Sequence, residues 1–445
     1  MQRAEFALQN IWGYPSFRSK QSEVVRAALN NDDCLVVMPT GGGKSLCFQV
    51  PAVVDKGVTL VISPLLSLLE DQINAVVSLP DGKGIPAMAW CSNSTEAAKR
   101  AMMIELTQKV HPVLKLLYTT PETLQTSSSL KEALQTLHKN GMFARIVIDE
   151  AHCISSWGHD FRPAYRKLGT IRKLYVGVPV MALTATASEK VRDDIIKQLK
   201  FKRNSKVTVR NPVKGHKMFL ASFDRPNLSW QIVPKEVPAV GSDALDQLLV
   251  LCQQSRFAGK CGIIYCRTRE DTEATSIHLS NAGIPSCHYH AGVTVGGRKW
   301  VQNAWMKNRI RIVCATIAFG MGIDKPDVRF VIHMAPASSI SGYYQETGRA
   351  GRDGNPAECV LMYHEGDIRK LLNMVNMPQK GNTKAKKEKK REKIYEMQIF
   401  CENTTSCLRV ELCSHFGEKA SRKLRCKGDN NDCGNCRRQK PQYVE

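Results

Sequence analysis

The chain has 445 residues, enough for two domains with complete hydrophobic cores and a smaller appendage. Its 63 basic residues exceed its 41 acidic residues, and the formal net charge of +22 favours a polyanionic partner, nucleic acid more than an acidic membrane surface. Because no apolar run reaches membrane-spanning length and the first residues lack the apolar core of a secretory signal, we expect an intracellular protein.

The first half of the chain predicts an α/β domain. Residues 5–29 have the pattern of two helices, interrupted at residues 13–15. Short apolar runs then alternate with helix-length segments, as in a parallel sheet covered by helices on both faces. These runs are residues 34–38, 58–63, 115–118, 144–148 and 178–183. A helix over residues 188–199 closes the series, and we place the connection to a second domain within or just after the basic segment 201–222.

The second half repeats this alternation and predicts another α/β unit of similar size. Its expected strands are residues 262–266, 286–290, 310–315, 328–333 and 358–363. Residues 380–393 follow, with eight basic and two acidic side chains. This run is a solvated loop or helix start, or a segment for nuclear import or for binding a DNA backbone.

The most informative stretch follows the first expected strand and consists of Thr40, Gly41, Gly42, Gly43, Lys44 and Ser45. Consecutive glycines can turn their N–H groups around an anion, and the positive end of the next helix points to the same place. Lys44 can then reach the β- and γ-phosphates of a nucleotide, and the Ser45 hydroxyl can bind the accompanying Mg²⁺. The alternative is a glycine-rich turn with a chance Lys-Ser pair. The general P-loop pattern has a glycine where this chain has Met38.

An acidic pair follows the fourth expected strand. Asp149 can hold Mg²⁺, and Glu150 can orient or deprotonate an attacking water molecule. A helix-capping acidic pair is the alternative. The P-loop about a hundred residues upstream favours the catalytic interpretation.

Residues 149–152 (Asp-Glu-Ala-His), together with the loop at 40–45, resemble a superfamily 2 helicase. The continuation over residues 153–163 resembles the RecQ family of DNA helicases, and the match extends from residue 13 to residue 436. The resemblance implies an α/β fold with two tandem RecA-like parallel-sheet domains and a small helical zinc-binding subdomain. The expected ranges are 1–213, 214–364 and 365–440.

The resemblance also implies roles for residues outside these two motifs. Tyr14, Arg18 and Gln21 match an adenine-recognition motif, in which a glutamine amide can pair with N6 and N7 of the base. Tyr14 could equally be an aromatic residue packed in a turn. Segment 63–72 matches a part that touches the DNA backbone, and segment 183–187 matches a motif that links nucleotide state to DNA grip. His152 is expected to form a hydrogen bond across the cleft between the domains.

In the second domain the resemblance covers residues 263–266, 315–324 and 343–354, and it implies site roles for Asp324, Gln345, Arg349 and Arg352. Two arginines three residues apart on a helix share one face, where both could meet a γ-phosphate and stabilise the charge that develops on it. A surface salt-bridge pair is the alternative.

Segment 152–165 is rich in aromatic residues. Aromatic rings stack on unpaired bases without regard to sequence. The resemblance makes this the loop that senses single-stranded DNA, through Trp157, His159, Phe161 and Arg162. Packing of Trp157 and Phe161 under the loop is the alternative. Ser156 stands where the family usually has glutamine.

Most of the 16 cysteines stand singly in strand-like runs, as reduced core cysteines do. The exception is a C-terminal cluster, Cys426, Cys433 and Cys436, which offers three of the four thiolates of a tetrahedral zinc site. The upstream candidates for the fourth ligand are Cys401, Cys407 and Cys413, and the family resemblance selects Cys407. The alternative for Cys433 and Cys436 alone is a redox pair. Leu408-Arg409 stands where the family usually has two arginines.

We therefore expect an ATP-dependent 3′→5′ DNA helicase acting in DNA repair, recombination or replication. Its expected cofactors are ATP, Mg²⁺ and Zn²⁺, and its expected partner is single-stranded or branched DNA. We expect a monomer in the nucleus, without the winged-helix and helicase-and-RNase-D C-terminal domains of longer family members. An RNA helicase, a double-strand translocase and a non-catalytic scaffold or strand-annealing protein are the alternatives.

Overall fold

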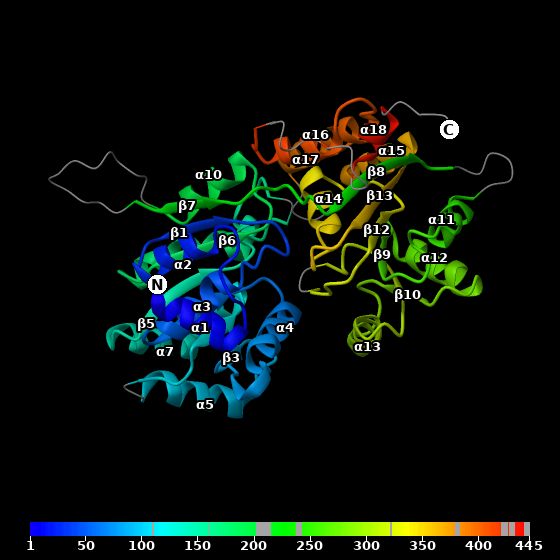
Figure 1. Cartoon of the computed structure of the whole chain (residues 1–445). Helices are drawn as coiled ribbons and strands as arrows, with labels where there is room; N and C mark the ends of the chain where they lie inside the picture. Colours follow the sequence, from blue (N-terminus) through cyan, green and yellow to red (C-terminus); the bar gives the residue numbers. More distant parts are fainter. Residues whose placement is uncertain are drawn as a thin grey trace. The chain divides into compact units, whose positions relative to one another are not determined.

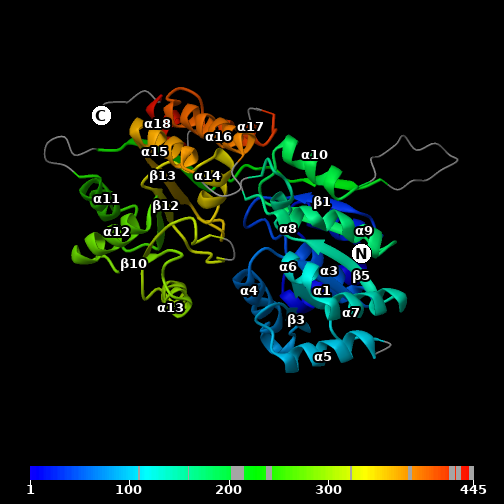
Figure 2. The same cartoon turned by 180° about the vertical axis from the view of Figure 1, so that it is seen from behind.

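The computed structural model describes residues 1–108, 111–158, 160–201, 215–236, 243–320, 323–378, 383–419, 426 and 432–439. The chain forms two compact units, Met1–Ser222 and Phe223–Glu445 (Figures 1 and 2). Among the described residues, no helix has both the length and the apolar character needed to cross a membrane.

The first unit is built on a seven-stranded sheet in the order β3-β4-β2-β5-β6-β1-β7. All of its paired strands run parallel. The strands are β1 (Cys34–Val37), β2 (Val58–Ile62), β3 (Ala87–Trp90), β4 (Leu116–Thr119), β5 (Phe143–Ile148), β6 (Val180–Thr184) and β7 (Lys217–Leu220).

Helices cover both faces of this sheet. Val147 of β5 belongs to the apolar cluster formed with α2, α3 and α4, whereas the equally buried Ile146 and Ile148 face the opposite side. The helices are α1 (Gln2–Trp12), α2 (Gln21–Leu29), α3 (Leu46–Val54), α4 (Leu66–Val77), α5 (Glu96–Thr107), α6 (Pro121–Thr126), α7 (Ser128–Lys139), α8 (Pro163–Arg166), α9 (Ile171–Leu174) and α10 (Glu189–Gln198). The continuous apolar runs of the sequence are therefore strands buried on two sides.

Two strands of the first unit were not expected from the sequence. Both are short edge strands of four residues: β3 is only partly buried, and β7 is mostly exposed. β7 pairs with β1 from Cys34↔Lys217 to Val37↔Leu220, which places it in the first unit. The division between the units thus falls after Ser222, whereas the sequence-based division at 213/214 assigned this strand to the second domain.

The second unit contains a six-stranded parallel sheet in the order β10-β11-β9-β12-β13-β8. Its strands are β8 (Leu228–Pro234), β9 (Gly262–Tyr265), β10 (Ser286–Tyr289), β11 (Ile312–Ala315), β12 (Phe330–His333) and β13 (Ala357–Tyr363). The helices along this sheet are α11 (Ala244–Gln253), α12 (Arg269–Asn281), α13 (Val295–Met306) and α14 (Ile340–Thr347). The edge strand β8 was not expected from the sequence.

A small helical part completes the second unit, with α15 (Glu365–Asn376), α16 (Lys384–Glu402), α17 (Leu408–His415) and α18 (Gly434–Arg438). α15 packs on α16, and both α17 and α18 contact β8. The basic run at 380–393 is a helix start from Lys384 onward, capped by the Thr383 side chain; residues 380–382 lie outside the described ranges.

Arg409 joins this helical part to β8. Its guanidinium is buried and donates to Asp224 Oδ1 at 2.6 Å, to the Arg225 carbonyl at 2.9 Å and to the Leu228 carbonyl at 2.9 Å. It also lies 5.3 Å from the centroid of the Trp230 ring. The buried Arg409 guanidinium therefore provides hydrogen-bond donors to the backbone carbonyls at the start of β8 and holds α17 against this strand.

We predict that Arg409→Met lowers the unfolding free energy of the second unit by about 3 kcal/mol, because it leaves the Asp224 carboxylate without this partner. Urea unfolding measures the change. Arg369→Met is the matched control: it breaks an exposed pair with Glu365 and should change stability by less than about 0.5 kcal/mol. Equal effects of the two substitutions would contradict the anchoring role.

Candidate nucleotide, nucleic-acid and metal sites

The glycine loop follows β1 and turns back on itself. The Gly42 N–H donates to the Pro39 carbonyl at 3.0 Å, and Gly41 and Gly43 have φ angles of 79° and 73°. Such angles favour glycine, which is why the loop needs glycine there. The Lys44 ammonium donates to the Met38 carbonyl at 3.1 Å and to the Pro39 carbonyl at 3.3 Å, so it lies over the loop.

The start of α3 lies directly behind the glycine loop. Ser45 occupies the N-cap position, and Leu46 is the first helical residue. The N–H groups of Cys47 and Phe48 donate to the Lys44 and Ser45 carbonyls at 3.0 and 3.2 Å, and the helix dipole is positive at this end. Together with Thr40, which precedes the glycines, Ser45 and the loop form a cradle suited to phosphate.

The expected adenine motif lies against this cradle. The Gln21 side chain is buried: its amide nitrogen donates to the Gly43 carbonyl at 3.0 Å, and its oxygen accepts the Arg18 N–H at 2.8 Å. These two bonds fix the Gln21 amide between the glycine loop and the chain at Arg18. The Tyr14 ring is 41% exposed, and the Arg18 guanidinium lies 5.6 Å from its centroid. An exposed ring next to a positioned amide is what base stacking with edge recognition requires.

The acidic pair stands at the end of β5. Asp149 is buried, and its carboxylate accepts the Gln72 amide at 2.9 Å and the Glu150 N–H at 2.9 Å. Burial, and after it the Glu150 charge, raises the pKa of Asp149 to about 6, while the Gln72 hydrogen bond and the Lys44 charge oppose the rise. From the sequence, Gln72 was expected only as part of a segment that touches the DNA backbone. In the structure its amide donates to the Asp149 carboxylate.

His152 lies deeper than the sequence suggested. Glu150 adopts a φ of 49°, and the following 3-10 turn over residues 151–154 turns His152 back toward β6. Its Nδ1 lies 2.9 Å from Thr184 Oγ1 and 3.3 Å from Glu150 Oε2, and the side chain is fully buried. These partners belong to the first unit, where His152 joins the acidic pair to the 183–187 motif. The expected bond to the other domain stays a prediction.

The aromatic-rich loop follows this turn. Trp157 is 38% exposed, Phe161 is half-buried, and His159 lies outside the described residues. Arg162 donates to Asp160 at 3.0 Å and to the Pro64 carbonyl at 2.6 Å, which joins the loop to the 63–72 segment. The exposure of Trp157 speaks against the alternative that its ring packs entirely beneath the loop.

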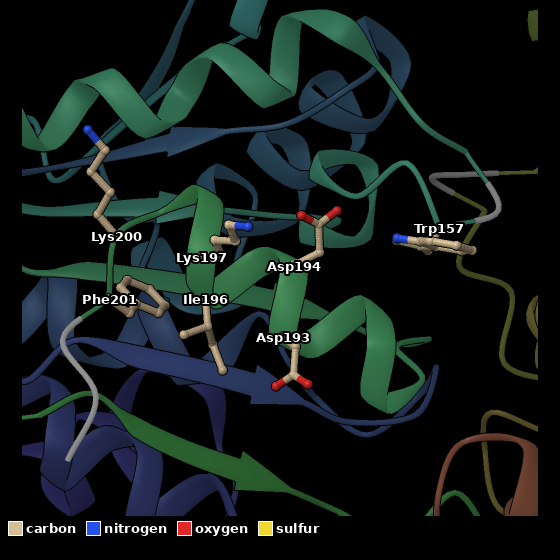
Figure 3. A pocket seen from close by; sticks show the side chains of 7 residues that line it. All are labelled: Trp157, Asp193, Asp194, Ile196, Lys197, Lys200 and Phe201. Carbon is tan, nitrogen blue, oxygen red and sulfur yellow. The ribbon is translucent and has the colours of Figure 1, made fainter. Parts of the chain in front are cut away.

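The loop returns to the acidic pair at its far end. The buried Tyr165 hydroxyl donates to the Asp149 carbonyl at 3.0 Å. A pocket next to the loop runs along α10 and is lined by Trp157, Asp193, Asp194, Ile196, Lys197, Lys200 and Phe201 (Figure 3). The aromatic-rich loop, the pocket along α10 and the acidic pair thus belong to one connected region of the first unit.

The arginines of the second unit do not share a helix face. α14 ends at Thr347, and Gly348 and Gly351 carry the chain into turns, the latter with a φ of 56°. Arg349 and Arg352 therefore lie beyond the helix, which corrects the sequence expectation, while Gln345 remains on it.

The side chains of these arginines are held by neighbouring loops. The buried Arg349 donates to the Gly320 carbonyl. Arg352 donates to Asp324 Oδ1 at 2.7 Å, and burial lowers the pKa of its guanidinium while the Asp324 charge opposes that change. The Asp324 side chain is 84% exposed. Arg352 thus forms a salt bridge, as the alternative interpretation expected. The partners of both arginines, Gly320 and Asp324, belong to segment 315–324, which the family resemblance covers.

Four cysteines meet in the helical part. The Sγ atoms of Cys407, Cys426, Cys433 and Cys436 all lie within 4.8 Å of one another. Cys407 Sγ is 3.6 Å from Cys426 Sγ and 3.9 Å from Cys433 Sγ. A tetrahedral zinc ion with Zn–S bonds of about 2.3 Å places its sulfurs about 3.8 Å apart, so the cluster fits zinc. Cys401 and Cys413, the other upstream candidates, are buried outside the cluster.

A second group, Glu273, His288 and His290, also has metal-ligand composition. The Gly292 N–H donates to His290 Nδ1 at 3.2 Å, which leaves the ring hydrogen on Nε2. Nε2 then donates to Glu273 Oε1 at 2.9 Å. Hydrogen bonding therefore accounts for His290 without a metal ion.

Three family models match the chain in order. They are DEAD/DEAH box helicase over residues 18–195, helicase conserved C-terminal domain over residues 242–354, and RecQ zinc-binding over residues 365–437. The last model covers the four cysteines of the cluster, which supports a zinc-binding part.

Curated relatives match nearly the whole chain. It is 40% identical over 427 residues to the RecQ-like DNA helicase BLM of Xenopus laevis, covering 96% of this chain and 30% of that protein. It is 41% identical over 438 residues to the ATP-dependent helicase SGS1 of Saccharomyces cerevisiae, covering 97% of this chain and 28% of that protein. It is 38% identical to the ATP-dependent DNA helicase Q1 of Rattus norvegicus, covering 94% of this chain and 62% of that protein. The chain thus spans between 28% and 62% of the length of these relatives.

Solved structures confirm the fold. The helicase MrfA bound to DNA matches with a TM-score of 0.65 at 18% identity, covering 83% of this chain and 49% of that chain. Dbp5 of Saccharomyces cerevisiae, bound to RNA and ADP BeF3, matches with a TM-score of 0.58 at 14% identity, covering 83% and 88%. The expected α/β fold with two tandem RecA-like domains is therefore confirmed.

We predict that Asp149→Asn stabilises the first unit at high pH when nucleotide and Mg²⁺ are withheld. Because the folded pKa lies above the ordinary value of 3.8, the wild type loses stability as the pH rises through about 6. The variant should be more stable by about 2 kcal/mol at pH 8, and the difference should vanish near pH 4. Urea unfolding across this range measures it. With the exposed Asp81→Asn as control, a pH-independent difference would contradict the buried-charge interpretation.

For the cysteine cluster, we predict that the wild type holds one zinc ion per chain and that Cys407→Ser releases it and lowers the melting temperature of the second unit. Elemental analysis of the purified protein measures the zinc content. Cys413→Ser is the control, because that thiol lies outside the cluster and its loss should leave the zinc in place. Zinc retained by the Cys407 variant would overturn the ligand assignment.

Proposed function

We propose, on the basis that this chain belongs to the RecQ family of DNA helicases, that it hydrolyses ATP and uses that energy to move 3′→5′ along single-stranded DNA and unwind duplexes. The supporting observation is the arrangement of the first sheet. The glycine loop follows β1, the acidic pair follows β5, and only β6 lies between these strands. Parallel strands end at one edge, so Lys44 and Asp149 face the same ligand space, where α/β sheets bind nucleotides.

The residues of this space have complementary tasks. Lys44 and the loop N–H groups bind the β- and γ-phosphates, and Glu150 orients the attacking water and accepts its proton. Ser45 and Asp149 offer a hydroxyl and a carboxylate oxygen, the hard donors that Mg²⁺ prefers, and would hold this ion. When bound, Mg²⁺ neutralises phosphate charge during the transfer.

The second domain supplies further charge. We assign Arg349 and Arg352 to stabilising the negative charge that develops on the transferred phosphate, with Gln345 and Asp324 as polar neighbours of the same site. In support, Arg349 is already oriented by the Gly320 carbonyl, so less side-chain freedom is lost on binding.

The DNA-contacting surface is assigned to the loop of Trp157, His159, Phe161 and Arg162, with His152 joining the acidic pair to Thr184. Trp157 stacks on unpaired bases, and Arg162 connects its loop to the segment before α4. The excess of basic residues suits single-stranded and branched DNA. We further propose that the protein works as a monomer in the nucleus, in DNA repair, recombination or replication.

Lys44→Ala tests the nucleotide site. It should lower the ATPase rate at least about 100-fold, because the phosphates lose their principal cation, while binding of single-stranded DNA is retained. A coupled ATPase assay and fluorescence anisotropy measure the two properties. The exposed Lys56→Ala is the control and should hydrolyse ATP at the wild-type rate. Turnover retained by the Lys44 variant would refute the assignment.

The nucleic-acid substrate is tested with the wild-type protein. ATPase stimulation is compared for single-stranded DNA, duplex DNA and RNA, and strand displacement is measured on forked and 3′-tailed duplexes. Stimulation by single-stranded DNA and displacement of 3′-tailed strands support the proposal. Stronger stimulation by RNA would favour an RNA helicase, and stimulation by duplex alone would favour a double-strand translocase.

A further inference from the structure

The backbone around Trp157 is held by one buried hydroxyl. The Ser155 hydroxyl donates to Asp194 Oδ2 at 2.7 Å, and its oxygen accepts the Trp157 N–H at 3.2 Å. The Ser155 carbonyl accepts the Gly158 N–H at 3.0 Å. One residue therefore fixes the chain on both sides of the exposed indole.

One stripe of α10 supports this arrangement. Lys190, Asp194 and Gln198 are spaced by four residues and so share a helix face. The Gln198 amide donates to Asp194 Oδ1 at 3.1 Å, which leaves the other carboxylate oxygen directed at Ser155. The Lys190 ammonium lies 5.7 Å from the centroid of the Trp157 ring, within cation–π range.

The turn at Gly158 packs closely on the backbone of His152 and Ser155. A Cβ atom there would press on the His152 carbonyl and lie 3.1 Å from the Ser155 carbonyl. This close approach requires glycine at position 158 and brings the Gly158 N–H to the Ser155 carbonyl. Asp193, the neighbour of Asp194, points to a different side of α10 (Figure 3) and has no such role.

We infer that Ser155 and Asp194 are positioning residues that hold Trp157 in the geometry that receives single-stranded DNA. The inference deepens the proposed function and rests on it for the role of Trp157. Serine is needed because its hydroxyl donates to one partner and accepts from another. A carboxylate is needed because a charge-assisted bond holds the hydroxyl more strongly than an amide does. Without this pair, DNA has to order the loop as it binds, so more DNA is needed for the same stimulation.

The test measures ATPase rate against the concentration of a single-stranded oligonucleotide. Ser155→Ala and Asp194→Asn should raise the half-stimulating concentration about tenfold and keep the maximal rate within about twofold. A merely structural defect would instead lower the maximal rate by reducing the folded fraction. Ser156→Ala and Asp193→Asn are matched neighbours and should stay within about twofold on both quantities. The double variant should be no worse than either single variant, because both remove one interaction.

A second measurement does not depend on the proposed function. Amide hydrogen exchange in the DNA-free protein should be about tenfold faster at Trp157 and Gly158 in the Ser155 and Asp194 variants, with the β-strands unchanged. If the wild type shows no DNA-stimulated hydrolysis, the proposed function fails, and this exchange decides the positioning role alone. Unchanged exchange, or an equal rise in half-stimulating concentration for Asp193→Asn, would overturn the inference.

Discussion

The buried carboxylate of Asp149 is the constraint on which the first unit depends. A charge removed from water must be compensated by partners, and here they come from separate segments: the Gln72 amide from α4, the Glu150 N–H and, at longer range, the Lys44 ammonium. The Tyr165 hydroxyl binds the carbonyl of the same residue. Segments far apart in the sequence therefore all contact Asp149, and a ligand that neutralises its carboxylate changes the interactions of each of these segments.

The helical part of the second unit depends on different forces. α15 and α16 pack through an apolar cluster with Ile368, Leu371 and Ile394, and the buried Phe400 and Phe416 pack against aromatic rings outside the helical part. The thiol cluster of the zinc-binding part and the buried Arg409 supply the remaining attachment, one by joining distant segments and the other by hydrogen bonds to the start of β8.

Most strands that were predicted from the sequence are buried on both faces, with the partly exposed β10 as an exception. Strands such as β1 and β6 are covered on both faces, so their apolar runs are unmistakable, whereas β3 and β7 are partly exposed and β8 follows a segment without regular pattern. The glycine loop, the acidic pair and the cysteines were found because their spacing along the chain carries the chemistry.

Features that depend on contacts between distant residues were missed or misplaced. The bond between Ser155 and Asp194 joins two short polar residues that no periodicity connects. α14 ends at Thr347, before Arg349, although the next residue, Gly348, keeps α-helical backbone angles, and the inward turn of His152 follows the left-handed angle at Glu150. The close approach of Gln21 to Gly43 has the same origin, and it has a consequence for how the glycine loop can change. A side chain at Gly43 would displace the Gln21 amide, so in the proposed nucleotide site a substitution in the phosphate loop would also disturb the residue assigned to the base.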